Sequence, residues 1–92
     1  MATLPVENNP PENRFEVNVD GETAVLLYEQ SDNQLTILET LVPPAIEGRG
    51  VGSALAKAGL DYAVENNLRV MVICPFVKAY VQRHPEYLDI VK

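Results

Sequence analysis

The chain has 92 residues, a formal net charge of −6 and an apolar content of 47%. Such a length gives one domain with a single core. No apolar run reaches the length of a membrane-spanning helix, and no basic patch indicates a nucleic-acid partner. One cysteine and one histidine exclude an internal disulfide and a cysteine-based zinc cluster and argue against a histidine-rich centre, so we expect no metal site.

Charge is divided unevenly along the chain. Residues 1–46 hold eight acidic residues and one basic residue, whereas residues 47–92 hold five acidic and six basic residues. This division would suit a site that binds an anionic cofactor beside a cationic substrate. The simpler interpretation, which the composition favours, is that the acids keep a small protein soluble.

The first 13 residues contain three prolines, three asparagines and two glutamates. They lack the basic start and apolar middle of a signal peptide, which predicts a cytoplasmic chain. We expect residues 1–13 to be a flexible lead-in and residues 14–92 to form one minimal domain.

Three strands are predicted in the first half of the domain. Apolar and polar residues alternate over 14–20, as in a half-buried strand, and Asp20-Gly21 then makes a tight turn. Residues 22–30 give the second strand and residues 34–42 the third. One face of the third strand is expected to carry Leu35, Ile37, Glu39 and Leu41, and the other Thr36, Leu38, Thr40 and Val42.

A helix and a fourth strand follow. Pro43-Pro44 ends the third strand because proline lacks the amide hydrogen of a ladder. Helical periodicity runs over 50–66 and leaves a narrow polar stripe in which Lys57 and Asp61 can pair. The apolar run 70–74 predicts a strand covered on both faces, parallel to the third strand through a right-handed crossover.

The end of the chain predicts a short helix from Pro75 to about Arg83. Its inward side chains should be Phe76, Val77, Tyr80 and Val81. Residues 87–91 are a candidate edge strand. The fold class is therefore α+β: an antiparallel three-stranded meander joined to a β-α-β crossover, with a short C-terminal helix.

Glycines at positions 48, 50 and 52 join the third strand to the helix. Glycine lets the backbone approach a bulky anion, and the first amides of a helix have no partners within it, so the junction suits a phosphate. An ordinary tight turn is the alternative. A Walker loop is disfavoured because Ser53-Ala54 follows Gly52 where Lys and Ser or Thr are required. The dinucleotide fingerprint is also a poor match, since Ser53 stands in place of its third glycine.

The run Glu47-Gly48-Arg49-Gly50-Val51-Gly52 resembles the acetyl-CoA signature of the GCN5-related N-acetyltransferase superfamily, Gln/Arg-x-x-Gly-x-Gly/Ala. The tail, with Cys74-Pro75-Phe76-Val77-Lys78-Ala79-Tyr80 and His84-Pro85-Glu86-Tyr87, is similar to that of its very small single-domain members. The resemblance covers residues 14–91. Glu47 departs from the usual Gln or Arg, and neighbouring Arg49 is the candidate to supply the positive charge instead.

This resemblance implies a cofactor site for acetyl-CoA. The third and crossover strands would splay apart with the thioester between them, and the third strand would pair with pantetheine near Leu41 and Val42. Larger members carry two helices between their early strands, which form a wall of the acceptor pocket. The short turns of this chain leave no room for them, so we expect the acceptor pocket to be open on that side. The CoA pyrophosphate would be held by the amides of Gly48, Arg49, Gly50, Val51, Gly52 and Ser53.

Three side chains are candidates for catalysis, each with a structural alternative. Cys74 precedes the helix start at Pro75, where a thiolate would be stabilised, but it can equally be a packed core thiol. By the resemblance, Tyr80 matches the position that protonates the departing CoA thiolate; otherwise it is a core tyrosine. Burial would raise the pKa of Glu39 and suit it to be the general base, unless its face is open to solvent. His84 is expected to be a helix cap.

The sequence therefore predicts an acetyl-CoA-dependent N-acetyltransferase that acts on an amine, by direct attack or through Cys74. The alternative is a CoA-binding or protein-interaction module on the same fold with little or no catalysis. The acceptor would be an amine-bearing small molecule or protein, with no nucleic acid or membrane as partner. The pattern leaves open whether the chain is a monomer or a weak homodimer.

Overall fold

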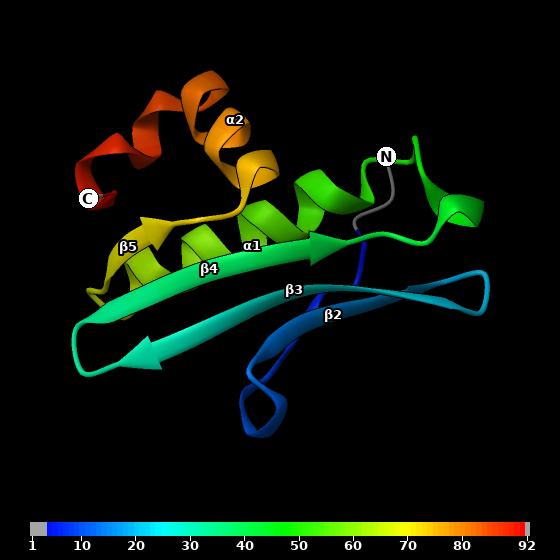
Figure 1. Ribbon diagram of the computed structural model, residues 1–92, viewed down its shortest axis with the longest axis horizontal. Helices are drawn as coiled ribbons and strands as arrows, with labels where there is room; N and C mark the ends of the chain where they lie inside the picture. Colours follow the sequence, from blue (N-terminus) through cyan, green and yellow to red (C-terminus); the bar gives the residue numbers. More distant parts are fainter. Residues whose placement is uncertain (1–3, 92) are drawn as a thin grey trace.

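Five strands form one mixed sheet in the order β1-β2-β3-β4-β5, with α1 behind it in Figure 1. The computed structural model describes residues 4–91. Within that range, no helix is long and apolar enough to cross a bilayer. The elements are β1 (Glu7–Asn9), β2 (Arg14–Val19), β3 (Glu22–Ser31), β4 (Gln34–Leu41), α1 (Val51–Glu65), β5 (Arg69–Val72) and α2 (Pro75–Arg83), with 3-10 helices at Pro10–Glu12, Pro44–Ile46 and Pro85–Ile90.

The predicted meander and crossover are confirmed. Strands β2, β3 and β4 pair antiparallel, and β5 pairs with β4 in parallel after α1. The β2–β3 turn has positive φ at both Asp20 (52°) and Gly21 (81°), which matches the twist of a two-residue hairpin. Asp-Gly adopts this turn readily, and the sequence therefore fixes the hairpin locally.

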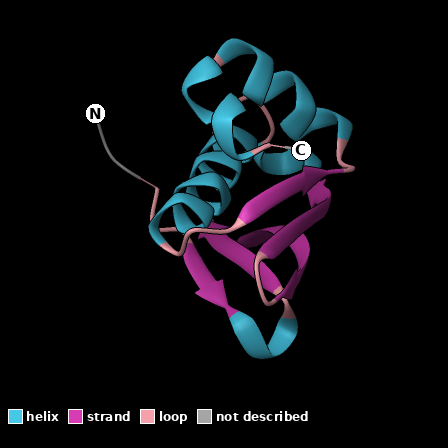
Figure 2. Ribbon diagram, turned by 90° about the vertical axis from the view of Figure 1, so that its left-hand side faces the viewer, coloured by secondary structure: helices cyan, strands magenta, loops and turns pink. Residues whose placement is uncertain are grey.

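The core lies between the sheet and the helices α1 and α2, which lie on one side of the sheet in Figure 2. Alternate residues of β2, β3 and β5 point at α1, as strand periodicity requires. Helix α1 can lie close to the sheet because Gly59 faces it, with Leu26 within van der Waals distance of a Cβ at that position. The largest fully buried side chains are Leu26, Leu35, Ile37, Ile46, Leu55, Leu60, Val51, Val70 and Val77.

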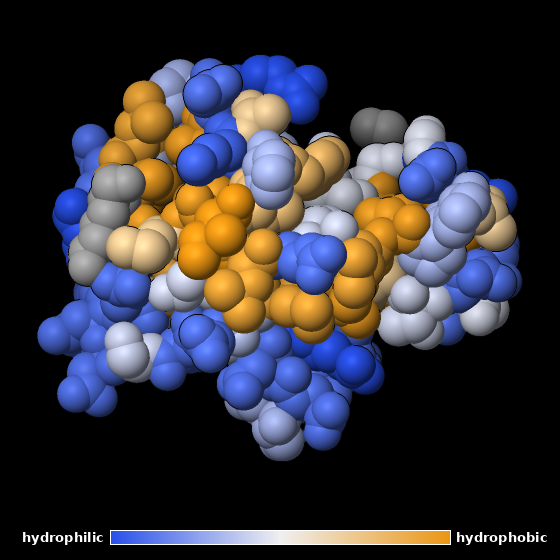
Figure 3. Space-filling view, in the orientation of Figure 1, coloured by the Kyte–Doolittle hydropathy of each residue, from blue (hydrophilic) through white to orange (hydrophobic). Residues whose placement is uncertain are grey.

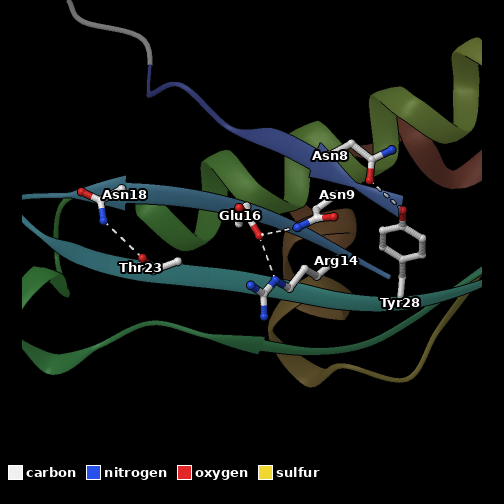
Figure 4. A network of polar contacts seen from close by, with 7 residues as sticks. All are labelled: Asn8, Asn9, Arg14, Glu16, Asn18, Thr23 and Tyr28. Carbon is white, nitrogen blue, oxygen red and sulfur yellow. Dashed lines mark hydrogen bonds and ion pairs between the residues drawn. The ribbon is translucent and has the colours of Figure 1, made fainter. Parts of the chain in front are cut away.

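The expected flexible lead-in is a wrong prediction for residues 7–12. Strand β1 pairs antiparallel with β2, and the 3-10 helix follows it. Figure 4 shows the polar contacts of this strand: Tyr28 donates a hydrogen bond to Asn8 at 2.6 Å, and Asn9 and Arg14 both donate to Glu16. Leu4 and Val6 pack on the core. Residues 1–3 of the lead-in lie outside the described residues.

A β-bulge corrects the predicted faces of β4. Leu27 pairs with Glu39 and Tyr28 with Ile37, so Leu38 is an extra residue without a partner on β3. The alternation therefore slips by one position. Thr40, and not Glu39, continues the inward face of Leu35 and Ile37, because Thr40 pairs with buried Leu26.

Two further expectations about the C-terminal half are also wrong. Strand β5 is covered on one face only, since Met71 is 40% exposed, and Ile73, which directly follows the strand, is 53% exposed. The candidate edge strand over 87–91 is instead mostly the last 3-10 helix, and only Val91 bridges to Val70. No helix covers the second face of the sheet among the described residues, which explains why the apolar run of β5 is half exposed.

Candidate functional site

The glycine junction forms one wall of a pocket of about 380 Å³. The pocket lies between the end of β4, the start of α1 and the start of α2. Its lining combines glycine backbone with apolar side chains and few polar groups, as in sites that orient a ligand by a small number of hydrogen bonds. The lining residues are Thr40, Val42, Ile46, Glu47, Gly48, Gly50, Val51, Gly52, Ser53 and Phe76.

The glycines of this wall differ in what they contribute. Gly48 and Gly50 have φ of +83° and +76°, in the left-handed region that strains other residues. At Gly52 the backbone lies close to Phe76, because a Cβ there would lie 2.8 Å from the tip of the ring, which would have to shift. The junction thus combines a left-handed backbone with a tight contact between the starts of α1 and α2.

The start of α1 presents hydrogen-bond donors to the pocket. Gly50 is the N-cap and provides no side-chain cap, and the first intrahelical bond runs from the Ala54 amide to the Gly50 carbonyl at 3.0 Å. The amides of residues 51–53 therefore have no partner within the helix. Three donors at the positive end of a helix of 15 residues suit an anionic group such as a phosphate.

The sheet opens beside this pocket. Parallel pairing of β4 and β5 ends at Ile37, whose carbonyl accepts hydrogen bonds from both Ile73 (2.9 Å) and Cys74 (3.2 Å). Strand β4 continues to Leu41, so among the described residues its last part has no backbone partner on the β5 side. The expected splay of the two strands is present, and the bulge at Leu38 lies at its origin.

Cys74 and Thr40 face each other across this opening, with Sγ and Oγ1 3.5 Å apart. Cys74 is the N-cap of α2, directly before Pro75, as the sequence predicts. The side chain is buried, with 3% of the residue exposed, and Thr40 rather than Cys74 is among the residues that line the pocket. The Thr40 hydroxyl therefore lies between the Cys74 thiol and the pocket.

The predicted cofactor residues are only partly gathered here. Gly48, Gly50, Val51, Gly52, Ser53 and Val42 line the pocket. Leu41 lies at the unpaired end of β4 with its side chain exposed. The Arg49 guanidinium instead forms an ion pair with Asp20 in the β2–β3 turn. The positive end of the helix is thus the local source of positive potential in the pocket wall.

Tyr80 lies in the contact between α1 and α2 and not among the residues that line the pocket. The Tyr80 ring stacks on the His84 ring, with 3.9 Å between the ring centroids. His84 is the C-cap of α2, as expected. Burial raises the pKa of the Tyr80 hydroxyl, and the nearby Lys57 ammonium partly offsets that effect. This environment fits the core-tyrosine alternative.

Glu39 is exposed on the face of the sheet that α1 does not cover. The burial expected of a general base is therefore absent. The sequence reasoning failed here because it assumed unbroken alternation, and the bulge reverses the orientation of every residue after Leu38.

Four residues that line the pocket were not among the predicted site residues: Thr40, Ile46, Glu47 and Phe76. Thr40 was assigned to the opposite face for the reason just given. Phe76 was expected to point inward, but its ring is exposed and packs over Gly52. The glycine at position 52 could have indicated that another group lies close to the backbone there, but the sequence does not say that this group is the Phe76 ring.

A mixed sheet that opens beside a glycine-lined helix start is the architecture that the sequence resemblance implies. Comparison with known proteins agrees, because the family model described as GCN5-related N-acetyl-transferase matches residues 14–90. The chain belongs to this family. Its fold is also similar to the NMR solution structure of a GCN5-like protein from Staphylococcus aureus, with a TM-score of 0.72 and 31% identity over 100% of this chain and 91% of that one.

Relatives of similar length are found in vertebrates. Protein NATD1 of Gallus gallus is 37% identical over 91 residues, which cover 94% of this chain and 83% of that protein. Protein NATD1 of Homo sapiens is 38% identical over 89 residues, which cover 91% and 79% of the two chains. The similarity extends beyond the glycine junction to nearly the whole domain.

Proposed function

We propose that this protein is an acetyl-CoA-dependent N-acetyltransferase that acts on an amine. The observation that carries the proposal is the pocket itself: unpartnered amides at the start of α1 face the same space as the open edge of β4. The amides suit the pyrophosphate of CoA, and the open edge near Leu41 and Val42 suits the amide groups of pantetheine. Family membership supports the same substrate.

The chemistry requires few catalytic side chains. A neutral amine attacks the thioester carbonyl, the C–S bond breaks, and the amide and CoA thiolate form. The proton lost by the amine balances the one taken up by the thiolate. Direct attack is favoured over an acetyl-cysteine because Cys74 is buried beside Thr40. The domain contributes mainly by holding the thioester where the two strands separate.

The glycine junction provides the direct test. Gly50→Asp would place a carboxylate near the proposed pyrophosphate, whereas Gly50→Asn has a similar shape and also tolerates the left-handed backbone. We expect the aspartate variant to bind CoA at least about tenfold more weakly than the asparagine variant, because like charges repel in a partly desolvated site. Isothermal titration calorimetry with CoA measures the difference.

Urea denaturation of both variants serves as the control for folding. Equal CoA affinity of the two folded variants would contradict the phosphate site. If CoA binds as expected but no amine releases free thiol from acetyl-CoA, the alternative of a CoA-binding module would replace the enzyme.

A further inference from the structure

The face of the sheet opposite α1 carries an apolar surface. In Figure 1 β4 lies in front of α1, and Figure 3, in the same orientation, shows hydrophobic atoms across the middle of this face. Leu41, Met71 and Ile73 are exposed, and the other members are half-buried. We call this surface the bare sheet face; its members are Val25, Leu27, Leu38, Leu41, Met71 and Ile73.

Two carboxylates of β3 and β4 lie on the same face, in addition to Glu16 of β2, which pairs with Val25. Glu39 pairs with Leu27, and Glu29 pairs with Thr36, which in turn neighbours Met71. Within residues 4–91, neither Glu29 nor Glu39 takes part in an ion pair. Of the bases on this face, Arg14 pairs with Glu16, whereas Arg69 donates to the Asp89 carbonyl and keeps its positive charge at the edge beyond Met71. The border near Glu39 therefore carries negative charge that no ion pair among the described residues compensates.

The bare sheet face also lies where the strands separate. Leu38 and Glu39 form the bulge, and Ile73 donates one of the last two backbone hydrogen bonds before the opening. On the other side of the sheet, Thr40 lines the pocket. Glu39 on the bare sheet face and Thr40 in the pocket wall are therefore neighbours in β4, so a group bound near Glu39 lies across the strand from the pocket.

We propose that the bare sheet face docks a polypeptide acceptor whose amine is flanked by apolar side chains, which rests on the proposed acetyl transfer. The apolar neighbours of the amine would cover the six members of the face, and the ammonium group would lie against Glu39. An exposed apolar surface of this kind on a small domain marks an interaction site. A second copy is a poorer occupant, because it would bring a second set of the acids Glu29 and Glu39 to a surface that already carries them, whereas an ammonium group complements them.

The experiment is an NMR titration of the isotopically labelled full chain without cofactor. The probe is the capped peptide acetyl-Ser-Leu-Lys-Leu-Ser-amide, and its matched twin has glutamate in place of lysine. We expect the lysine peptide to shift the amides of residues 25–29, 38–41 and 71–73. We also expect it to bind at least about tenfold more tightly than the glutamate twin.

Variants with matched controls assign the contributions. Ile73→Gln removes apolar contact and Glu39→Gln removes charge, and each should weaken binding of the lysine peptide by about threefold to tenfold. The matched controls lie on α1, on the other side of the sheet. Val64 is 49% exposed, close to the 53% of Ile73, and Glu65 is an exposed acid like Glu39. Val64→Gln and Glu65→Gln should leave the peptide affinity unchanged.

Three outcomes would overturn the proposal: equal affinity of the two peptides, shifts confined to α1, or a homodimer that Ile73→Gln dissociates in analytical ultracentrifugation. Loss of CoA binding with peptide binding intact would contradict the proposed function and leave the docking surface standing. The two proposals therefore fail separately.

Discussion

At the scale of single residues, Leu38 decides which side chains reach the pocket. As an unpaired residue it reverses the alternation of β4, which turns Thr40 toward Cys74 and Glu39 toward solvent. Bulges beside functional sites commonly re-aim a side chain in this way. The pairing of β4 with β5 ends one residue before Leu38, so the bulge lies where the sheet opens and determines which side chains line the opening.

Cys74 gives a prediction at this scale. We expect Cys74→Ala to retain kcat within about tenfold, because the buried thiol packs on Thr40 and the amine attacks the thioester directly, whereas removing an essential nucleophile costs several orders of magnitude. Thiol release from acetyl-CoA measures kcat. Mass spectrometry of the wild-type protein after incubation should show no acetyl adduct on Cys74; an adduct that forms and decays at the turnover rate would establish a covalent route instead.

At the scale of elements, Asp61 links α1 to the C-terminal segment. It accepts hydrogen bonds from Lys57 and from Tyr87, both at 2.6 Å. Burial alone would raise the pKa of Asp61, but these two hydrogen bonds outweigh it and lower the pKa. Burial and the hydrogen bond to Asp61 raise the pKa of the Tyr87 hydroxyl well above its usual range. The ionised carboxylate therefore stabilises the contact between helix and tail.

The stability of the domain should depend on this carboxylate in a pH-dependent way. The folded-state pKa of Asp61 is depressed, so its contribution is complete above the unfolded pKa of about 3.9 and is lost as the pH falls through the folded value. We expect Asp61→Asn to lower the free energy of unfolding by about 1 kcal/mol at neutral pH. As the pH falls below the unfolded pKa and through the depressed folded value, the difference from wild type should shrink.

Urea denaturation at several pH values measures this effect. Asp32→Asn, which alters an exposed carboxylate in the β3–β4 turn, is the matched control and should change stability little at any pH. A penalty for Asp61→Asn that is constant from neutral pH to pH 2 would show that the charge of Asp61 is not what stabilises the contact.

At the scale of the whole molecule, the N-terminal segment completes the sheet. Deleting residues 1–9 would remove β1, the hydrogen bond from Tyr28 to Asn8 and the packing of Leu4 and Val6. We expect the free energy of unfolding to fall by about 2 kcal/mol, from lost apolar burial and hydrogen bonding. Urea denaturation of the truncated chain measures the loss.

Asn8→Ala is the companion variant and should reproduce part of the loss, because it removes only the partner of Tyr28. CoA affinity should not change in either variant, since the pocket lining begins at Thr40. An unchanged urea midpoint after truncation would mean that β1 does not contribute to the stability of the sheet.

Local periodicity and turn chemistry explain what the sequence by itself determined. Alternation predicted β2, an apolar run between two turns predicted β3, Asp20-Gly21 predicted the turn that joins them, and the glycine spacing predicted a junction that opens α1. The amphipathic pattern of α1, together with the apolar run of β5, predicted the crossover. These features depend on a few neighbouring residues, so they can be read before the chain is folded.

Only the tertiary structure decided the site. The bulge at Leu38 is a property of the pairing of β4 with β3, and it sets the orientations of Thr40 and Glu39. The partner of Arg49 lies 29 residues away in sequence, and the exposure of Ile73 depends on which faces the two helices leave uncovered. The glycine junction shows where an anion can bind, whereas the chemistry around it depends on contacts between elements that local sequence patterns do not specify.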